Sequence, residues 1–274
     1  MIDIIKIPAR WFDRRVTKGR LFLWWHGCFG QKRRSIEEMS NRAILIGGCG
    51  RSGTTLVLSL LSAHPNIFCL PREMRAFCAN AYADENITKD PEFRIDYVYS
   101  HLIDTNFSST DAKRWCEKTP KNVYFAEQLM SYFGEDARFI HVVRDGRDVV
   151  TSEHPAAPGE YWVSPKRWVE DVSRGREASS HPQVKTIRYE DVVSSPLEVM
   201  ESTCAFLDEQ FTEAAFRAYP ESSQFDDRGE WFGGTKEMHG RSVARWKNEE
   251  YQDVVSRLMN QSGAEELLEY YGYL

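Results

Sequence analysis

An apolar run that ends in a turn rich in glycine and hydroxyl groups most constrains how this chain of 274 residues folds. Residues 43–48 read Ala-Ile-Leu-Ile-Gly-Gly, residues 49–55 read Cys-Gly-Arg-Ser-Gly-Thr-Thr, and a helical pattern runs from residue 56 to residue 64. This order predicts a strand, a loop and a helix N-terminus, where backbone N–H groups and the helix dipole favour an anion. The loop is therefore predicted to bind phosphate or sulfate. The residues of this predicted anion site are Arg51, Ser52, Gly53, Thr54 and Thr55.

The loop lacks the lysine of the loops that bind nucleoside triphosphates. Gly48 and Gly53 have the glycine spacing of that motif, but Thr54 stands where the lysine would be. That lysine reaches the outer phosphates, and the hydroxyl next to it holds magnesium. ATP hydrolysis and kinase chemistry are therefore disfavoured. A phosphorylated nucleotide that carries fewer charges in a row and needs no metal fits better.

Four blocks of sequence resemble the sulfotransferases that use 3′-phosphoadenosine 5′-phosphosulfate (PAPS). The 5′-phosphosulfate loop of that family reads Arg-Ser-Gly-Thr-Thr after a buried strand, as residues 51–55 do here. The other blocks, in the family's order, are residues 117–120 (Glu-Lys-Thr-Pro), residues 138–152 and residues 187–191 (Ile-Arg-Tyr-Glu-Asp). The resemblance covers about residues 43–274. A generic anion-binding loop is the weaker alternative, because four blocks in order are specific.

The resemblance also implies which residues bind the donor. An arginine at the end of a strand and a serine eight residues later bind the 3′-phosphate in the family, and Arg144 and Ser152 match both. The lysine of the Lys-Thr-Pro segment faces the sulfate, which implies that role for Lys118, with a surface lysine as the alternative. Three weaker matches near the nucleotide are Tyr189, Ser242 and Trp246, and core packing explains Trp246 equally well.

Sulfuryl transfer needs a base beside the acceptor and a cation beside the leaving oxygen. We assign the cation to Lys118, with Arg51 sharing the sulfate and the 5′-phosphate. The cytosolic small-molecule enzymes carry a histidine two places after this lysine, where this chain has Pro120. Tyrosylprotein and heparan-type relatives use a glutamate after the second strand, and Glu73 falls there if one residue is gapped. The alternative for Glu73 is a structural ion pair with a neighbouring arginine of the same loop.

Composition indicates a globular protein with an unusual beginning. The chain has eight Trp, twelve Tyr and fifteen Phe and a net charge of −6. Residues 1–40 hold nine Lys and Arg against four Asp and Glu, interleaved with aromatic side chains. We expect a basic, aromatic extension packed on a sulfotransferase domain of residues 41–274, and favour this over contact with an anionic membrane surface. The acidic remainder disfavours nucleic acid as a partner.

The six cysteines show no metal-ligand spacing, so no metal site is expected. Cys69 and Cys116 each precede a proposed site block, and the resemblance to tyrosylprotein sulfotransferases implies that they could pair. We expect them to be reduced and the protein to be cytoplasmic. The reasons are that PAPS is made in the cytosol and that neither an export leader nor an apolar run of membrane-spanning length is visible.

The alternation of strands and helices predicts an α/β fold, a P-loop-like arrangement of three layers with a central parallel sheet and helices on both faces. Ligands then bind at the carboxyl ends of the strands, where Arg51, Glu73, Lys118 and Arg144 fall. Residues 153–159 contain two prolines and a glycine and are predicted to be an irregular, mobile lid. Residues 90–112 are predicted to be an acceptor-side insertion, and residues 225–240 a second flexible loop. Predicted strands are 43–48, 67–70, 139–143 and 184–188, and predicted helices are 55–63, 123–133, 165–179 and 196–207.

Together these features predict a single-domain sulfotransferase that takes PAPS, releases 3′-phosphoadenosine 5′-phosphate (PAP) and needs no metal. The acceptor is a hydroxyl of a small molecule, a carbohydrate or a tyrosyl peptide, or else an amine. A nucleotide kinase and a non-catalytic PAP-binding protein are the alternatives from other classes. The sequence leaves the oligomeric state open.

Overall fold

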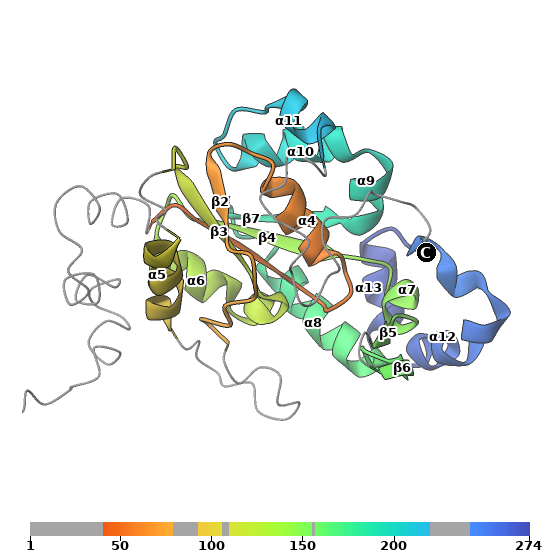
Figure 1. Ribbon diagram of the computed structural model, residues 1–274. Coiled ribbons are helices and arrows are strands. Elements are labelled where there is room, and N and C mark those ends of the chain that lie inside the picture. Colours follow the sequence, from red (N-terminus) through yellow and green to blue (C-terminus); the bar gives the residue numbers. More distant parts are fainter. Residues whose placement is uncertain (1–40, 79–92, 106–109, 155–156, 220–241) are drawn as a thin grey trace, which may run out of the picture.

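The computed structural model describes residues 41–78, 93–105, 110–154, 157–219 and 242–274, which Figure 1 draws in colour. The basic extension of residues 1–40 and the loop of residues 225–240 lie outside these described residues. The predicted insertion of residues 90–112 is described only in part, and it contains a helix.

The centre of the fold is a parallel sheet with the strand order β2-β3-β1-β4-β7. Strand β1 lies in the middle, and all six of its residues are buried. A parallel sheet is covered on both faces, so its strands are continuously apolar, as the sequence of β1 is. The strands are β1 (Ala43–Gly48), β2 (Ile67–Cys69), β3 (Arg114–Lys118), β4 (Arg138–Val143) and β7 (Val184–Arg188).

Helices follow the strands, and the local sequence sets some of their ends. For α8, Ser164 accepts a hydrogen bond from the backbone N–H of Arg167, and Pro165 occupies the first turn. Gly134 ends α6. The α-helices are α4 (Thr54–Leu61), α5 (Ile95–Asp104), α6 (Ala126–Phe133), α7 (Gly146–Val150), α8 (Pro165–Ala178), α9 (Tyr189–Ser194), α10 (Pro196–Phe206), α11 (Glu213–Arg217), α12 (Gln252–Met259) and α13 (Ala264–Tyr270). The 3-10 helices are η2 (Pro120–Phe125), η4 (Arg245–Lys247) and η5 (Glu249–Tyr251).

The two faces of the sheet bury different hydrophobic clusters, because successive side chains of a strand point to opposite sides. Ile44 and Ile46 pack with residues of α4 and α10 on one face, whereas Leu45 packs with residues of α5 and α6 on the other. Figure 1 shows α4, α9, α10 and α11 above the sheet and α6 and α8 below it. The predicted three-layer α/β fold is therefore confirmed.

The prediction that residues 153–159 are irregular is wrong for the part that the structure describes. Strands β5 (Glu153–His154) and β6 (Ala157–Tyr161) pair antiparallel, with an irregular register at the start of the pair. Pro158, one of the residues that suggested a loop, is compatible with a two-stranded ribbon, because each strand keeps one edge on which no ladder hydrogen bond is required. Residues 155–156 lie outside the described residues.

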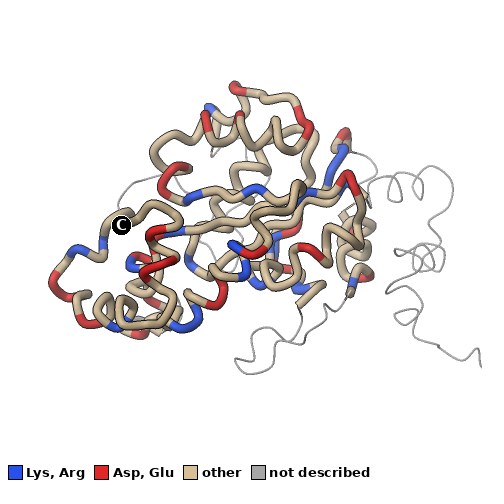
Figure 2. The backbone as a smooth tube through the Cα atoms, turned by 180° about the vertical axis from the view of Figure 1, so that it is seen from behind, with Lys and Arg blue, Asp and Glu red and all other residues tan. Residues whose placement is uncertain are grey.

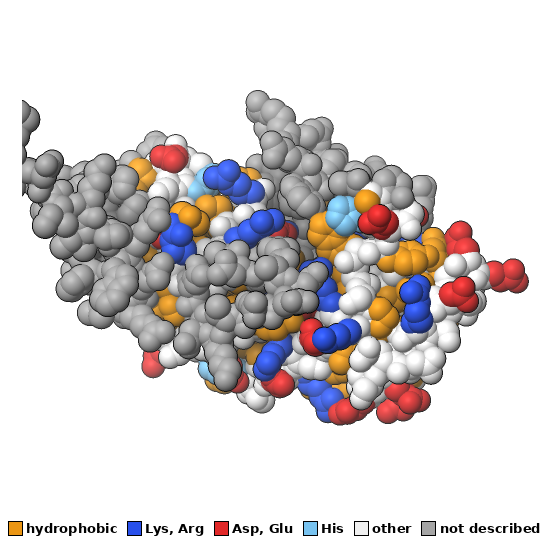
Figure 3. Space-filling view, turned by 90° about the horizontal axis from the view of Figure 1, so that it is seen from below, with side chains coloured by type: hydrophobic (Ala, Val, Ile, Leu, Met, Phe, Trp, Pro, Cys, Tyr) orange, Lys and Arg blue, Asp and Glu red, His pale blue; other side chains and the backbone are white. Residues whose placement is uncertain are grey.

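Charge is spread over the described surface. Figure 2 shows acidic and basic residues interspersed along the helices and loops, and Figure 3 shows Lys and Arg side chains among hydrophobic ones over the centre and right of the lower face. No helix within the described ranges is both long and apolar enough to cross a bilayer.

One buried histidine on β4 makes the stability of the fold depend on pH. His141 is fully buried between the sheet and α8, where a Cβ added at Gly175 would lie 2.1 Å from His141 Nε2. Burial lowers the pKa of His141 from 6.5 to about 4, because the charged imidazolium would lose its hydration. The folded protein therefore holds this ring neutral under conditions in which the unfolded chain protonates it.

We predict that the free energy of unfolding falls by about 2 kcal/mol between pH 7 and pH 5 through His141 alone, because the unfolded state binds the extra proton. Chemical denaturation at both pH values measures the difference, and the His141→Leu variant lacks this part of it. Identical pH dependence in the two proteins would contradict the assignment.

Candidate active site

The carboxyl edge of the sheet brings the predicted site residues together in the order of the strands. Lys118 ends β3 and pairs in register with Ile46 of β1, so it lies beside the start of the anion-binding loop. Arg144 follows β4, and Tyr189 follows β7, whose Arg188 is in register with Val143. Read across the sheet from β2 to β7, the edge carries Glu73, Lys118, Arg51, Arg144 and Tyr189.

The loop after β1 is shaped by two left-handed residues. Arg51 has φ 67° and Gly53 has φ 91°, and α4 begins at Thr54. The first N–H groups of a helix have no partner within it, so the start of α4 offers donors to an anion. The hydroxyl of Ser52 is buried and has no hydrogen-bond partner among the described residues. An unsatisfied buried donor beside free backbone N–H groups fits a phosphate ligand.

Tyr189 lies between this loop and Arg144. A Cβ added at Gly53 would lie 2.4 Å from Tyr189 Cδ2, so the ring packs directly on the loop backbone. The Arg144 guanidinium carbon lies 4.4 Å from the centre of the same ring. The family match at Tyr189 therefore coincides with a buried aromatic ring that contacts both the loop and Arg144.

Arg144 is buried and its own hydrogen bonds fix its direction. Nη1 donates to the carbonyl of Arg51 at 3.1 Å, and Nη2 donates to the carbonyl of Ser242. Its Nε has no partner among the described residues. Burial lowers the pKa of Arg144, and the charge of Arg245 lowers it further. The pKa of Arg51 is also lowered, first by desolvation and then by the charges of Arg144 and Arg245. Solvent still reaches part of the Arg51 side chain.

Arg245 is a site residue that the sequence reasoning missed. Its Nη2 donates to Ser152 Oγ at 3.0 Å and to the carbonyl of Asp148 at 3.2 Å, and its Nε has no partner among the described residues. The third arginine therefore joins the predicted pair of Arg144 and Ser152. Its place between Ser242 and Trp246, both singled out in the sequence, was the available signal.

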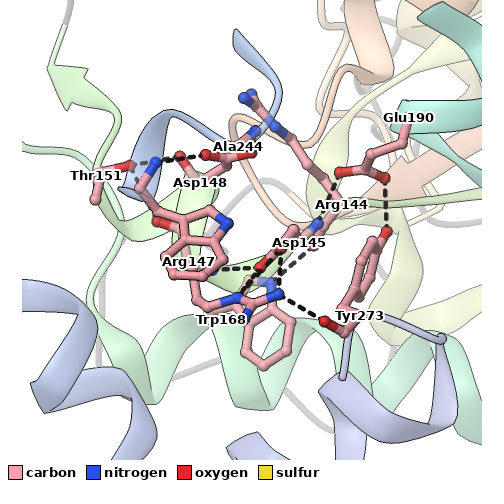
Figure 4. A network of polar contacts seen from close by, with 10 residues as sticks. Arg144, Asp145, Arg147, Asp148, Thr151, Trp168, Glu190, Ala244 and Tyr273 are labelled. Carbon is pink, nitrogen blue, oxygen red and sulfur yellow. Dashed lines mark hydrogen bonds and ion pairs between the residues drawn. The ribbon is translucent and has the colours of Figure 1, made fainter. Parts of the chain in front are cut away.

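A buried carboxylate holds the segment that carries Arg245. Asp148 accepts hydrogen bonds from the backbone N–H of Ala244 at 2.8 Å and of Trp246 at 3.0 Å, as Figure 4 shows in part. The Trp246 ring is half-buried and lies 4.0 Å from the Arg147 guanidinium carbon. Trp246 therefore covers α7 at the rim of the site and does not belong to the hydrophobic core.

The same region also fixes the last residues of the chain. Arg147 donates to Asp145 and to the carbonyl of Tyr273, and the Tyr273 hydroxyl donates to Glu190 at 2.8 Å. Glu190 in turn accepts from the backbone N–H of Asp145. Figure 4 shows this network surrounding Arg144 from the side of α7.

On the other side of the loop, Glu73 and Lys118 form a close ion pair. Lys118 Nζ donates to Glu73 Oε1 at 2.6 Å, with the lysine side chain 2 % exposed and the glutamate 22 % exposed. The ion pair that the structure shows for Glu73 is thus with the lysine of β3. The proposed base and the proposed cation therefore lie side by side at the edge of the pocket.

Cys69 and Cys116 are register neighbours on β2 and β3, and both are buried free thiols. Burial raises the pKa of Cys116 well above its usual value, and the hydrogen bond with Cys69 adds to this. No cluster of three or more His, Cys, Asp or Glu side chains suited to a metal ion occurs in the described part of the chain.

The sulfotransferase family model matches residues 43–213, more than half of the chain. The chain belongs to the sulfotransferase family. Among curated proteins it is 26% identical over 201 residues to the protein-tyrosine sulfotransferase of Drosophila melanogaster, covering 62% of this chain and 39% of that protein. It is 30% identical over 122 residues to protein-tyrosine sulfotransferase A of Caenorhabditis elegans, covering 40% of this chain and 32% of that protein. The chain thus spans well under half the length of these two relatives.

Solved sulfotransferases share the fold. The sulfotransferase domain of the Synechococcus olefin synthase superimposes with a TM-score of 0.56 at 19% identity, over 85% of this chain and 94% of that domain. A mouse sulfotransferase solved with PAP superimposes with a TM-score of 0.50 at 14% identity, over 88% of this chain and 94% of that one. The resemblance found in the sequence is confirmed at the level of the family and the fold.

The contact between Gly53 and Tyr189 leads to a prediction about the donor loop. We predict that Gly53→Ala lowers the free energy of unfolding by about 2–4 kcal/mol, because the new Cβ meets a left-handed backbone and the Tyr189 ring. Gly159→Ala is the matched control, since Gly159 has φ 86° but nothing within 4 Å of an added Cβ, and should cost only about 1 kcal/mol. If thermal or chemical denaturation shows that both variants lose the same free energy of unfolding, the Tyr189 ring does not pack on the loop as described.

Proposed function

We propose that the protein transfers a sulfuryl group from PAPS to a hydroxyl group of an acceptor and releases PAP. The observation that carries the proposal is the order of side chains along one sheet edge: a carboxylate and a lysine 2.6 Å apart, followed by Arg51 in the glycine loop and by Arg144. Arg245 reaches this edge from η4 through Ser152. Membership of the sulfotransferase family supports this reaction over the kinase and the non-catalytic PAP-binding protein.

Donor binding is assigned to two anion sites, both in contact with Tyr189. The 5′-phosphosulfate is held by the loop of residues 51–55 and the start of α4, where the Ser52 hydroxyl has no partner among the described residues. The 3′-phosphate is held by Arg144, Ser152 and Arg245, whose two guanidinium Nε atoms also lack partners there. Phosphate oxygens are strong acceptors for such donors, and guanidinium groups match their geometry.

Transfer is assigned to Glu73 and Lys118. The acceptor oxygen attacks the sulfur in line while the bond between sulfur and the bridging phosphate oxygen breaks, and PAP leaves. Glu73 takes the proton of the acceptor hydroxyl, and Lys118, with Arg51, stabilises the charge that develops on the leaving oxygen. Lys118 is suited to this, because its ammonium group is a compact positive charge that can follow the departing oxygen.

The acceptor is proposed to carry a hydroxyl group, and a tyrosyl peptide is the first to test because the curated relatives are protein-tyrosine sulfotransferases. Incubation with sulfur-labelled PAPS and a panel of tyrosyl peptides, polysaccharides and small alcohols measures transfer. The proposal expects labelled product with at least one acceptor and release of PAP in the presence of a metal chelator. No transfer across the panel, despite PAP binding, would favour the non-catalytic alternative.

Recognition of the 3′-phosphate gives a prediction for Arg144. We expect Arg144→Ala to weaken PAP binding by about 100-fold and to change the affinity for adenosine 5′-phosphate by less than about 3-fold, since only PAP offers the 3′-phosphate. Arg138→Ala is the control, because Arg138 begins the same strand and its guanidinium pairs with Asp208 instead. Calorimetric titration of the three proteins decides the matter, and equal loss of both nucleotides in Arg144→Ala would contradict the role.

The assignment of the base gives a prediction for Glu73. We expect Glu73→Ala to lower the rate of transfer by about 100-fold or more while PAP affinity stays within about 3-fold, because the carboxylate acts on the acceptor and not on the nucleotide. Glu201→Ala, an exposed carboxylate on α10, serves as the control. Retained transfer in Glu73→Ala would remove Glu73 from this role.

A further inference from the structure

A second glutamate lies next to Lys118 and is not part of the proposed chemistry. Glu117 is fully buried at the end of β3. Its Oε1 accepts hydrogen bonds from Thr119 Oγ1 at 2.5 Å and from the backbone N–H of Met74 at 3.1 Å, and its Oε2 accepts from Asn122 Nδ2 at 2.7 Å. Burial raises the pKa of the Glu117 carboxyl, while these three hydrogen bonds oppose the rise.

The contacts of Glu117 and Thr119 reach the backbone directly after Glu73. Met74 N–H donates to Glu117, and Arg75 N–H donates to Thr119 Oγ1 at 3.2 Å. Two consecutive peptide groups of the loop are therefore bound by side chains from the end of β3. Arg75 also has φ 50°, a left-handed conformation that a residue other than glycine keeps only where its surroundings hold it.

The direction of the side chains shows how these two hydrogen bonds orient the loop. Neighbouring residues of a strand point to opposite faces of the sheet, so Glu117 and Lys118 project from β3 in opposite directions. The loop after β2 passes the end of β3 in such a way that the Glu73 carboxylate meets Lys118 while the Met74 N–H meets Glu117. The hydrogen bond to Glu117 thus sets the direction in which the loop presents Glu73.

Glu117 is a buried carboxylate, and burying a carboxylate carries a large desolvation cost unless its oxygens are hydrogen-bonded. The donors to Glu117 are a backbone amide, a hydroxyl and a side-chain amide. These donors require an acceptor with two oxygens. The backbone amide links Glu117 to the loop, and the side-chain amide links it to η2.

We propose that Glu117 is a positioning residue that, together with Thr119, holds residues 73–75 so that the Glu73 carboxylate stays at Lys118. The proposal rests on the function proposed above for Glu73 and Lys118. Glu117 acts through the loop and does not touch donor or acceptor. Asn122 completes the arrangement, because its Nδ2 also approaches the carbonyl of Ile46 and so ties Glu117 to the central strand.

Amide hydrogen exchange tests directly whether Glu117 and Thr119 hold residues 74 and 75. The measurement needs no substrate that accepts the sulfuryl group. We expect Glu117→Ala to speed the exchange of the Met74 and Arg75 amides by about 10-fold or more relative to amides of β4, because Met74 loses its acceptor and Thr119, the acceptor of Arg75, loses the carboxylate that fixes its hydroxyl. Thr119→Val should act in the same way on Arg75. The control is Glu209→Gln, which alters another buried carboxylate, one that pairs with Arg114 at the opposite end of β3. Exchange at residues 74 and 75 that is unchanged in Glu117→Ala would overturn the proposal.

Kinetics separate positioning from a purely structural role. With an acceptor that the wild-type protein sulfates, we expect Glu117→Ala to lower kcat by about 100-fold while PAP affinity stays within about 3-fold, since only the base is displaced. Glu117→Gln should recover at least about 10-fold of that loss, because its amide oxygen still accepts the Met74 N–H. Equal loss of kcat and PAP affinity, or no difference between the alanine and glutamine variants, would contradict positioning. If the wild-type protein sulfates no acceptor, the proposed function fails while the exchange measurement still decides the role of Glu117.

Discussion

Three guanidinium groups held close together at the carboxyl edge of the sheet are the constraint on which the site depends. Arg144 is buried, and the pKa of Arg51 is lowered first by desolvation and then by the positive charges of Arg144 and Arg245. Like charges in a partly desolvated pocket repel one another, and none of the three forms an ion pair with a carboxylate of the described residues. The ligand proposed above, with its separated phosphate groups, would relieve this repulsion, and the charge of the nucleotide would then contribute to the binding energy.

The segments that carry Arg245 and Glu73 are each held by a buried carboxylate that accepts hydrogen bonds from their backbone. Asp148 accepts two backbone N–H groups from residues 244 and 246, and Glu117, with Thr119, takes those of residues 74 and 75. A non-glycine residue in the left-handed conformation, Ala244 or Arg75, lies within each segment. Burial raises the pKa of Asp148 as it does that of Glu117. In both places a buried acidic side chain fixes backbone so that a neighbouring side chain reaches the pocket.

Local sequence predicted most of what lies on the sheet and less of what crosses between loops. The apolar run of β1 and the glycine turn after it have no other stable local structure, so the strand, the loop and α4 follow from them, and the parallel order then places Lys118 and Arg144 at one edge. Arg245 and Glu117 were missed because their roles come from partners far apart in the chain, such as Ser152 for Arg245 and Met74 for Glu117. Residues 153–159 were misjudged because their prolines and glycine were read as excluding a strand, whereas a two-stranded ribbon tolerates Pro158.

A crystal structure of the protein with bound PAP tests the central claim most directly. The account predicts the 5′-phosphate against the backbone of residues 51–55 and the 3′-phosphate within hydrogen-bond distance of Arg144, Ser152 and Arg245, with the Tyr189 ring between them. A nucleotide bound away from the three arginines, or with its two phosphates exchanged between the pockets, would contradict it.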